Sequence, residues 1–149
     1  MRRLGALLAA RLRRGDVVIA SGELGAGKTV LAQGIGEGLG VAGRVISPTF
    51  VLARRHASAT LPLVHADAYR LGSAAELEDI DLDDTLPESV TYIEWGAGLA
   101  EGLSDERLEI RIERLADDVR RVELTPVGAR WQDVDWDGLT QQFEAGGDE

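Results

Sequence analysis

The segment VVIASGELGAGKT, residues 17–29, joins a short apolar run to a glycine-rich loop. Val17 to Ala20 is a continuous apolar run, which is typical of a strand buried on both faces of a parallel sheet. Residues 22–29, Gly22-Glu23-Leu24-Gly25-Ala26-Gly27-Lys28-Thr29, match the phosphate-binding pattern G-x-x-x-x-G-K-[ST]. A helix is expected from Thr29 to Leu39, with Gly40 as its C-terminal stop. Strand, loop and helix in this order predict an α/β domain of the P-loop NTPase type, three-layered, with a mainly parallel central sheet.

Each part of this loop has a chemical reason. Its glycines let the backbone approach a phosphate and point N–H groups at it. The loop residues expected to bind nucleotide are Glu23, Leu24, Gly25, Ala26, Gly27, Lys28 and Thr29. Lys28 would neutralise the β- and γ-phosphates of a nucleoside triphosphate, and the Thr29 hydroxyl would ligate Mg²⁺. Lys28 is also the only lysine among 16 basic residues, at the one position that favours a compact ammonium.

Two acids follow buried strands and are candidates for the magnesium site. Asp67 ends the apolar run 61–66, and Glu94 ends the run 90–93. Both positions lie at the carboxyl ends of strands, where open α/β sheets place their ligands. The pattern alone does not divide the roles between them. His65, two residues before Asp67, is expected to be a packed and satisfied histidine rather than a ligand or base.

Ser47-Pro48-Thr49 is a second group of candidate nucleotide-binding residues. A loop that reaches for the γ-phosphate needs a hydroxyl such as that of Thr49. The pattern by itself favours a plain turn.

Further elements are expected on both sides of this core. Leucine spacing predicts a helix over residues 2–13, and apolar runs predict strands at 45–46, 50–53, 61–66 and 90–93. A short helix is expected at 74–79. Alternation predicts an antiparallel pair at 108–112 and 122–124, which would extend the sheet. Glycines at 34, 36 and 38 inside the second helix suggest close packing against the sheet. Residues 1–128 form the predicted ATPase domain, and 129–149 an acidic extension that Trp131, Trp136 and Phe143 would dock onto it.

Composition excludes several classes of protein. The 149 residues are 44% hydrophobic and 28% charged, which is the balance of a soluble globular protein. No apolar run approaches the roughly 20 residues of a membrane span, and arginines at 11, 13 and 14 argue against a signal peptide. The chain contains no cysteine. These features favour a cytoplasmic location.

The net charge of −10 bears on partners. Proteins that hold nucleic acid by themselves usually present a basic face, and residues 71–106 contain no lysine or arginine. Direct binding of nucleic acid is therefore not expected as the main activity. The acidic run between Glu76 and Glu88 is either a solvated face or a docking surface for a basic partner.

Four motifs in order resemble one known family. They are GELGAGKT at 22–29, SPTF at 47–50, HADAYRL at 65–71 and IEWG at 93–96. Over about residues 5–125 the chain resembles the TsaE family, bacterial P-loop ATPases of tRNA threonylcarbamoyladenosine biosynthesis. The chain begins almost at its first helix, whereas family members usually carry preceding residues that help hold adenine.

The resemblance implies roles that the pattern leaves open. Glu94 would be the Walker B-type acid near Mg²⁺, and Asp67 a second essential carboxylate beside the γ-phosphate or its water. Thr49 would belong to a nucleotide-sensing loop. Trp95, Tyr69 and Arg70 would lie around the site or on a partner surface.

The resemblance also implies partners. Family members work with the TsaB–TsaD complex, which transfers a threonylcarbamoyl group to adenosine 37 of tRNA. ATP hydrolysis would reset that complex, and tRNA would be met only indirectly.

Three other functions compete with ATP hydrolysis. In a small-molecule kinase, Asp67 would activate a substrate hydroxyl and Arg70 would hold its anion, but residues 71–106 lack the bases of a phosphate-covering lid. A GTPase would need N-K-x-D, which is impossible because Lys28 is the only lysine. A protein that merely holds ATP would not need two acids at one phosphate site.

Overall fold

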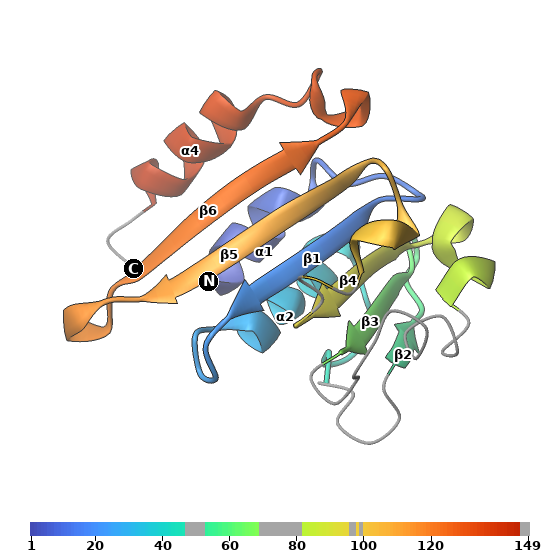
Figure 1. Cartoon of the computed structure of the whole chain (residues 1–149), viewed down its shortest axis with the longest axis horizontal. Coiled ribbons are helices and arrows are strands. Elements are labelled where there is room, and N and C mark those ends of the chain that lie inside the picture. The colour runs from blue at the N-terminus through green and yellow to red at the C-terminus, as the bar shows by residue number, and fades with distance from the viewer. Residues whose placement is uncertain (47–52, 69–81, 96–97, 99, 147–149) are drawn as a thin grey trace.

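The described residues of the computed structural model, 1–46, 53–68, 82–95, 98 and 100–146, contain a six-stranded sheet in the order β2-β3-β4-β1-β5-β6 (Figure 1). The strands are β1 Val17–Gly22, β2 Ala53–His56, β3 Leu63–Asp67, β4 Val90–Glu94, β5 Arg107–Arg114 and β6 Arg120–Val127. Strands β3, β4, β1 and β5 run parallel, while the edge strands β2 and β6 pair antiparallel with β3 and β5. The expected fold class, a mainly parallel sheet extended by antiparallel strands, is confirmed.

Strand β1 lies at the centre of the sheet and is buried on both faces. Val18 and Ala20 face the core shared with the helices, whereas Val17 and Ile19 belong to the core on the opposite face. Both sets are at most 2% exposed. The unbroken apolar run therefore reflects burial from two sides, as parallel strands in α/β folds require.

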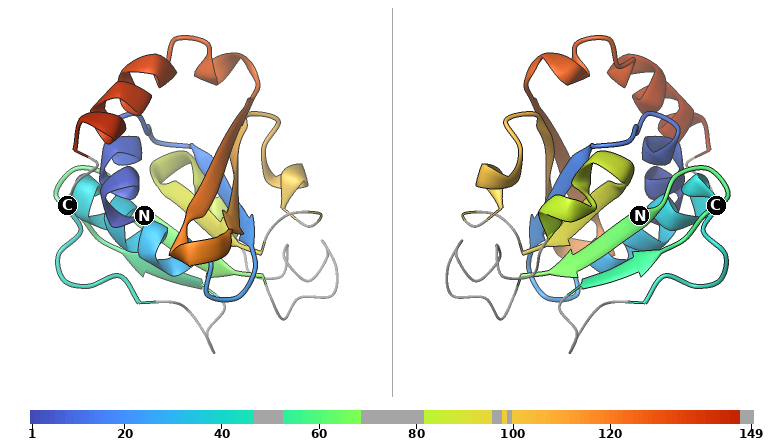
Figure 2. Two further views of the ribbon diagram at one scale, coloured as in Figure 1. Left: turned by 90° about the vertical axis from the view of Figure 1, so that its left-hand side faces the viewer. Right: turned by 90° about the vertical axis from the view of Figure 1, so that its right-hand side faces the viewer.

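Helices cover one face of the sheet. Helices α1 (Arg2–Ala9), α2 (Lys28–Leu39) and α4 (Trp136–Ala145) all lie on that side (Figure 2). The other face is covered by side chains from short 3₁₀ turns η1 (Leu82–Asp84), η2 (Leu86–Glu88) and η3 (Glu101–Leu103) and from Ala100 beside them. Among the described residues, none of the helices is long or apolar enough to cross a membrane.

The glycines of α2 serve helix–helix packing. A Cβ on Gly34 would collide with the backbone of Arg2 in α1, and a Cβ on Gly38 would meet Ala9. Gly36 instead faces the side chains of Val45 and of Leu63 in β3. The expected packing against the sheet is therefore met in part at Gly36, whereas Gly34 and Gly38 pack against α1.

Other local expectations differ from the structure. Helix α1 ends at Ala9 rather than at residue 13, although Leu12 beyond it is still buried. Residues 45–46 form no strand, because Val45 packs onto α2 and accepts a hydrogen bond from Gln33 Nε2. Of the expected strand 50–53 only Ala53 is described, where it begins β2. The expected helix at 74–79 lies outside the described residues.

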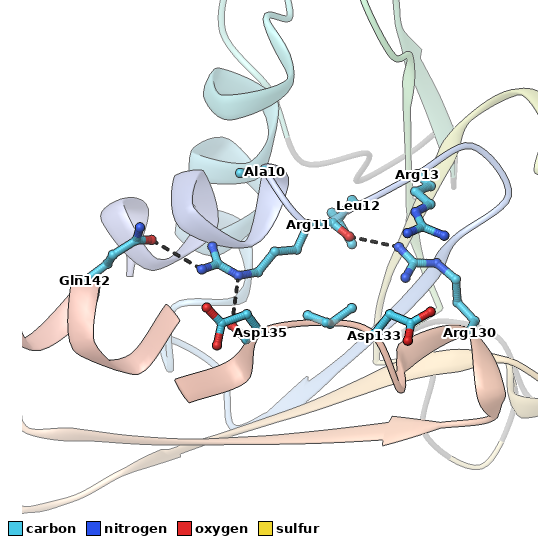
Figure 3. A pocket seen from close by; sticks show the side chains of 9 residues that line it. Ala10, Arg11, Leu12, Arg13, Arg130, Asp133, Asp135 and Gln142 are labelled. Carbon is cyan, nitrogen blue, oxygen red and sulfur yellow. Dashed lines mark hydrogen bonds between the residues drawn. The ribbon is translucent and has the colours of Figure 1, made fainter. Parts of the chain in front are cut away.

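Residues after β6 return to the helical face through turn η5 (Ala129–Trp131) and α4. Arg130 donates hydrogen bonds of 2.9 and 2.8 Å to the two carboxylate oxygens of the buried Asp16. Arg11 reaches across to the carbonyl of Asp135 and the side chain of Gln142 (Figure 3). Trp131 is buried in the core, and the guanidinium carbon of Arg130 lies 4.4 Å from its ring centroid. The division of the chain at residue 128 stays a prediction.

Candidate functional site

The loop between β1 and α2 has the backbone that a phosphate cradle needs. Gly25 and Gly27 have φ angles of 80° and 117°, a region that side chains with a Cβ rarely adopt. A Cβ on Gly22 would press on the carbonyl of Ile112 in β5. Helix α2 begins directly at Lys28, so its positive dipole end and its first N–H groups open onto the loop. The loop is thus shaped for an anion.

Lys28 is folded back over this loop. Its Nζ donates hydrogen bonds of 2.8 Å to the carbonyls of Gly22 and Glu23 and lies 3.9 Å from the ring centroid of Trp95. Burial lowers the pKa of Lys28, while the charges of Glu94 and Asp67 partly oppose this shift. The ammonium is therefore largely removed from water, and an entering anion would stabilise its charge.

Trp95 comes directly after β4 and is one of three non-glycine residues with positive φ in the described part of the chain. Its φ is 62°, and its backbone N–H donates a 2.9 Å hydrogen bond to the carbonyl of Ala20 in β1. Strained backbone of this kind concentrates at functional sites. It turns the indole ring toward Lys28.

Glu94, at the end of β4, is only 3% exposed. Thr29 Oγ1 donates a 2.9 Å hydrogen bond to its Oε1, and His65 Nε2 lies 2.6 Å from its Oε2. The carboxylate is thus held from α2 on one side and from β3 on the other. Hydrogen bonds from both sides compensate for the loss of water around a buried charge.

Tyr92 fixes the start of α2 against the sheet. Its hydroxyl donates a 2.7 Å hydrogen bond to the carbonyl of Lys28, and its ring meets that of His65 edge to face at 5.5 Å. Burial, with a further contribution from Glu94, raises the pKa of the Tyr92 phenol well above its usual value. The hydroxyl therefore stays protonated and remains a donor.

Asp67 stands beside Glu94 because β3 and β4 are parallel neighbours in which these two residues are register partners. Both acids line a cavity of about 330 Å³ together with the loop and the start of α2. The other lining residues are Leu24, Gly25, Gly27, Lys28, Thr29, Val30 and Trp95. Four residues singled out from the sequence as chemically active, Lys28, Thr29, Asp67 and Glu94, therefore meet in one cavity.

The donors at this cavity suit a magnesium ion. The hydroxyl of Thr29 and the carboxylate of Glu94 are hard oxygen ligands that lie within hydrogen-bond distance of each other. Mg²⁺ prefers such ligands and usually takes its remaining ones from water and phosphate. The described residues contain no group of three or more acids, histidines or cysteines that could hold a metal by themselves. The residues present fit an ion bound together with a nucleotide.

Several predicted residues cannot be placed. Thr49, Tyr69 and Arg70 lie outside the described residues. The contact of His65 with Glu94 was not expected from the sequence, which favoured a histidine satisfied within the core. His65 is fully buried, as expected, but its Nε2 is bonded to a site acid. The one sequence feature that points to this contact is the position of His65 two residues before Asp67.

Comparison with known proteins agrees over most of the chain. The family model "Threonylcarbamoyl adenosine biosynthesis protein TsaE" matches residues 1–122. A Streptomyces coelicolor protein named tRNA threonylcarbamoyladenosine biosynthesis protein TsaE is 56% identical over 142 residues, covering 91% of this chain and 96% of the relative. A Bacillus subtilis protein of the same name is 42% identical over 127 residues, covering 85% and 79%.

A solved structure resembles the fold as well. The crystal structure of Bacillus subtilis YdiB superposes with a TM-score of 0.72 at 33% identity, covering 99% of this chain and 88% of that one. The family model spans the loop, both acids and the strands that carry them. The chain belongs to the TsaE family of tRNA threonylcarbamoyladenosine biosynthesis proteins.

Proposed function

We propose that this chain binds ATP with Mg²⁺ in the cavity between the glycine-rich loop and the ends of β3 and β4, and hydrolyses it. The observation that carries the proposal is the hydrogen bond between Thr29 of the loop helix and the buried Glu94. A hydroxyl from the phosphate loop and an acid from a neighbouring strand are the pair that P-loop enzymes use around their metal ion.

The proposed roles follow from position. Loop N–H groups, including those of Glu23, Leu24, Gly25, Ala26 and Gly27, would hold the phosphates, and Lys28 would turn from its two carbonyl partners to the β- and γ-phosphates. Thr29 and Glu94 would hold Mg²⁺, which supplies charge neutralisation of the phosphates when bound. Thr49 would contact the nucleotide from its own loop.

Asp67 would act on the attacking water. A carboxylate that accepts a hydrogen bond from this water orients the water, so that a lone pair of the water oxygen points at the phosphorus. Glu94 is assigned to the metal ion beside Thr29, and the family resemblance implies a second essential carboxylate, so we assign Asp67 to the γ-phosphate side of the cavity. Both residues reach the cavity from adjacent strand ends.

ATP is preferred over GTP in this proposal because the guanine-recognition motif N-K-x-D cannot be built in a chain whose only lysine is Lys28. Competition of ATP and GTP for a fluorescent ATP analogue tests this preference. Stronger displacement by ATP is expected, and stronger displacement by GTP would contradict it. Accumulation of a phosphorylated metabolite without free phosphate would favour a kinase instead.

We further propose that hydrolysis serves the TsaB–TsaD complex, which modifies adenosine 37 of tRNA. Support comes from family membership and from the net charge of −10, which disfavours an independent grip on tRNA. The test is capture of TsaB and TsaD from the same organism on immobilised chain in ATP or in ADP, with Lys28→Ala as the control. Capture that requires ATP and is lost in the variant is expected. Absence of capture in either nucleotide would contradict the coupling.

A further inference from the structure

His65 is a fully buried polar residue behind the cavity. The side chain is 0% exposed, in the middle of β3, and its Nε2 lies 2.6 Å from Oε2 of Glu94. The other oxygen of the carboxylate, Oε1, accepts from Thr29 at 2.9 Å. Each oxygen of Glu94 therefore has one partner, one from the nucleotide-binding helix and one from the core of the sheet.

The hydrogen bonding identifies the donor. Nδ1 of His65 has no hydrogen-bond partner among the described residues. A buried N–H without a partner is unfavourable, so the arrangement that fits is the tautomer with its proton on Nε2. In that tautomer His65 donates to Glu94, and Nδ1 is a bare acceptor. The ring plane is fixed by the edge-to-face contact with Tyr92, the register partner of His65 in β4.

We propose that His65 is a positioning residue for Glu94 in the hydrolysis of ATP. The hydrogen bond to Oε2 stops the carboxylate from rotating, so that Oε1 stays directed at Thr29 and at the proposed metal position. Without this donor, Oε2 would be a buried oxygen without a hydrogen bond. The carboxylate would then rotate until Oε2 found another donor. Hydrogen-bond partners behind a metal-binding group commonly change metal affinity or activity about 10–100-fold when removed.

A second consequence concerns Asp67. His65 and Asp67 are two residues apart on β3 and point to the same face of the sheet. One strand therefore carries both the residue that orients Glu94 and the second acid of the cavity. A displacement of β3 would disturb both acids together, whereas removal of the imidazole takes the donor from Glu94 and leaves the backbone of β3 in place.

The test compares variants that keep and lose the donor. His65→Gln can place an amide N–H near the Nε2 position, whereas His65→Asn is too short to reach Glu94. His65→Phe keeps the aromatic packing without any donor. His56→Phe is the matched control, because His56 is the other histidine of the chain and lies on the neighbouring strand β2.

This inference rests on the proposed function, so turnover and metal dependence are measured separately. In His65→Asn and His65→Phe we expect kcat to fall about 10–100-fold while KM for ATP changes less than about threefold. His65→Gln should recover most of kcat, and His56→Phe should match the wild type. Equal kcat in wild type and His65→Asn would overturn the inference, as would equal losses in the Gln and Asn variants.

The Mg²⁺ concentration that half-saturates ATP binding gives a readout without turnover. It should rise about tenfold in His65→Asn and stay near the wild-type value in His65→Gln. Equal Mg²⁺ dependence in both variants would overturn the role of His65 even if the wild type hydrolyses ATP. A wild type that binds MgATP without hydrolysing it would overturn the proposed function instead, and the Mg²⁺ titration would still decide the role of His65.

Discussion

Thr29 and Glu94 are 65 residues apart in the chain, yet Thr29 Oγ1 donates a 2.9 Å hydrogen bond to Glu94 Oε1. The contact exists because β1 and β4 are parallel neighbours in which Ala20 and Glu94 are register partners. Their carboxyl ends therefore meet at one edge, and the loop after β1 brings the first turn of α2 back over the end of β4. The sheet topology itself assembles the proposed magnesium site.

Thr29→Val tests the hydroxyl in this pair. The change keeps the branched shape but removes the donor to Glu94 and the proposed ligand, so the Mg²⁺ requirement for ATP binding should rise about tenfold. Binding of ATP without Mg²⁺ should change little. Thr91→Val is the matched control, because Oγ1 of the buried Thr91 has no hydrogen-bond partner among the described residues. An unchanged Mg²⁺ requirement in Thr29→Val would remove Thr29 from the metal site.

The lowered pKa of Lys28 predicts that nucleotide affinity depends on pH. Its pKa in the free protein is lowered, chiefly by burial, so its ammonium deprotonates at a pH below that of an ordinary lysine. A triphosphate favours the charged form, so binding at alkaline pH takes up a proton, and affinity falls as pH rises through the lowered pKa. Calorimetry in two buffers of different ionisation heat measures this uptake. Lys28→Ala should bind more weakly and lose this uptake; identical uptake in the variant would assign it to another group.

Gly34→Ala tests the close approach of α1 and α2. The added Cβ would collide with the backbone of Arg2, which cannot give way as a side chain can. Overpacking of this kind costs up to about 3 kcal/mol, more than the gain of about 1 kcal/mol in helix propensity. A lower free energy of unfolding is expected in denaturant titrations. Gly102→Ala in η3 should be near neutral, since a Cβ there meets nothing within 4 Å. Equal stability of both variants would show that α1 can move away from α2.

Much of this fold can be predicted from local patterns in the sequence. The apolar runs of β1, β3 and β4 are recognisable because each strand is buried on both faces. The alternation in β5 is recognisable because only every second residue of that strand is fully buried. The loop glycines and the single lysine identified the phosphate site. Strand-end position brought Asp67 and Glu94 forward as candidates, and the register of β3 and β4 explains why both face one cavity.

Other features depend on contacts between distant residues. Val45 resembles a strand residue, but its burial comes from packing against Gly36 of α2. Gly34 and Gly38 of α2 could not be assigned to α1 rather than to the sheet, because periodicity does not identify the neighbouring element. His65 looked like an ordinary core histidine, since its contact with Glu94 needs the pairing of β3 with β4.

The proposal that the cavity hydrolyses MgATP is tested most directly by phosphate release from ATP in the presence of TsaB and TsaD, comparing the wild type with Glu94→Gln. The amide keeps the size of the side chain but removes the charge beside Thr29 and His65. We predict Mg²⁺-dependent release by the wild type, at least about 100-fold slower release by the variant, and ATP affinity within about threefold of the wild type. Glu113→Gln, a change on β5, should behave as the wild type. Equal release by wild type and Glu94→Gln, or no release by either, would contradict the proposal.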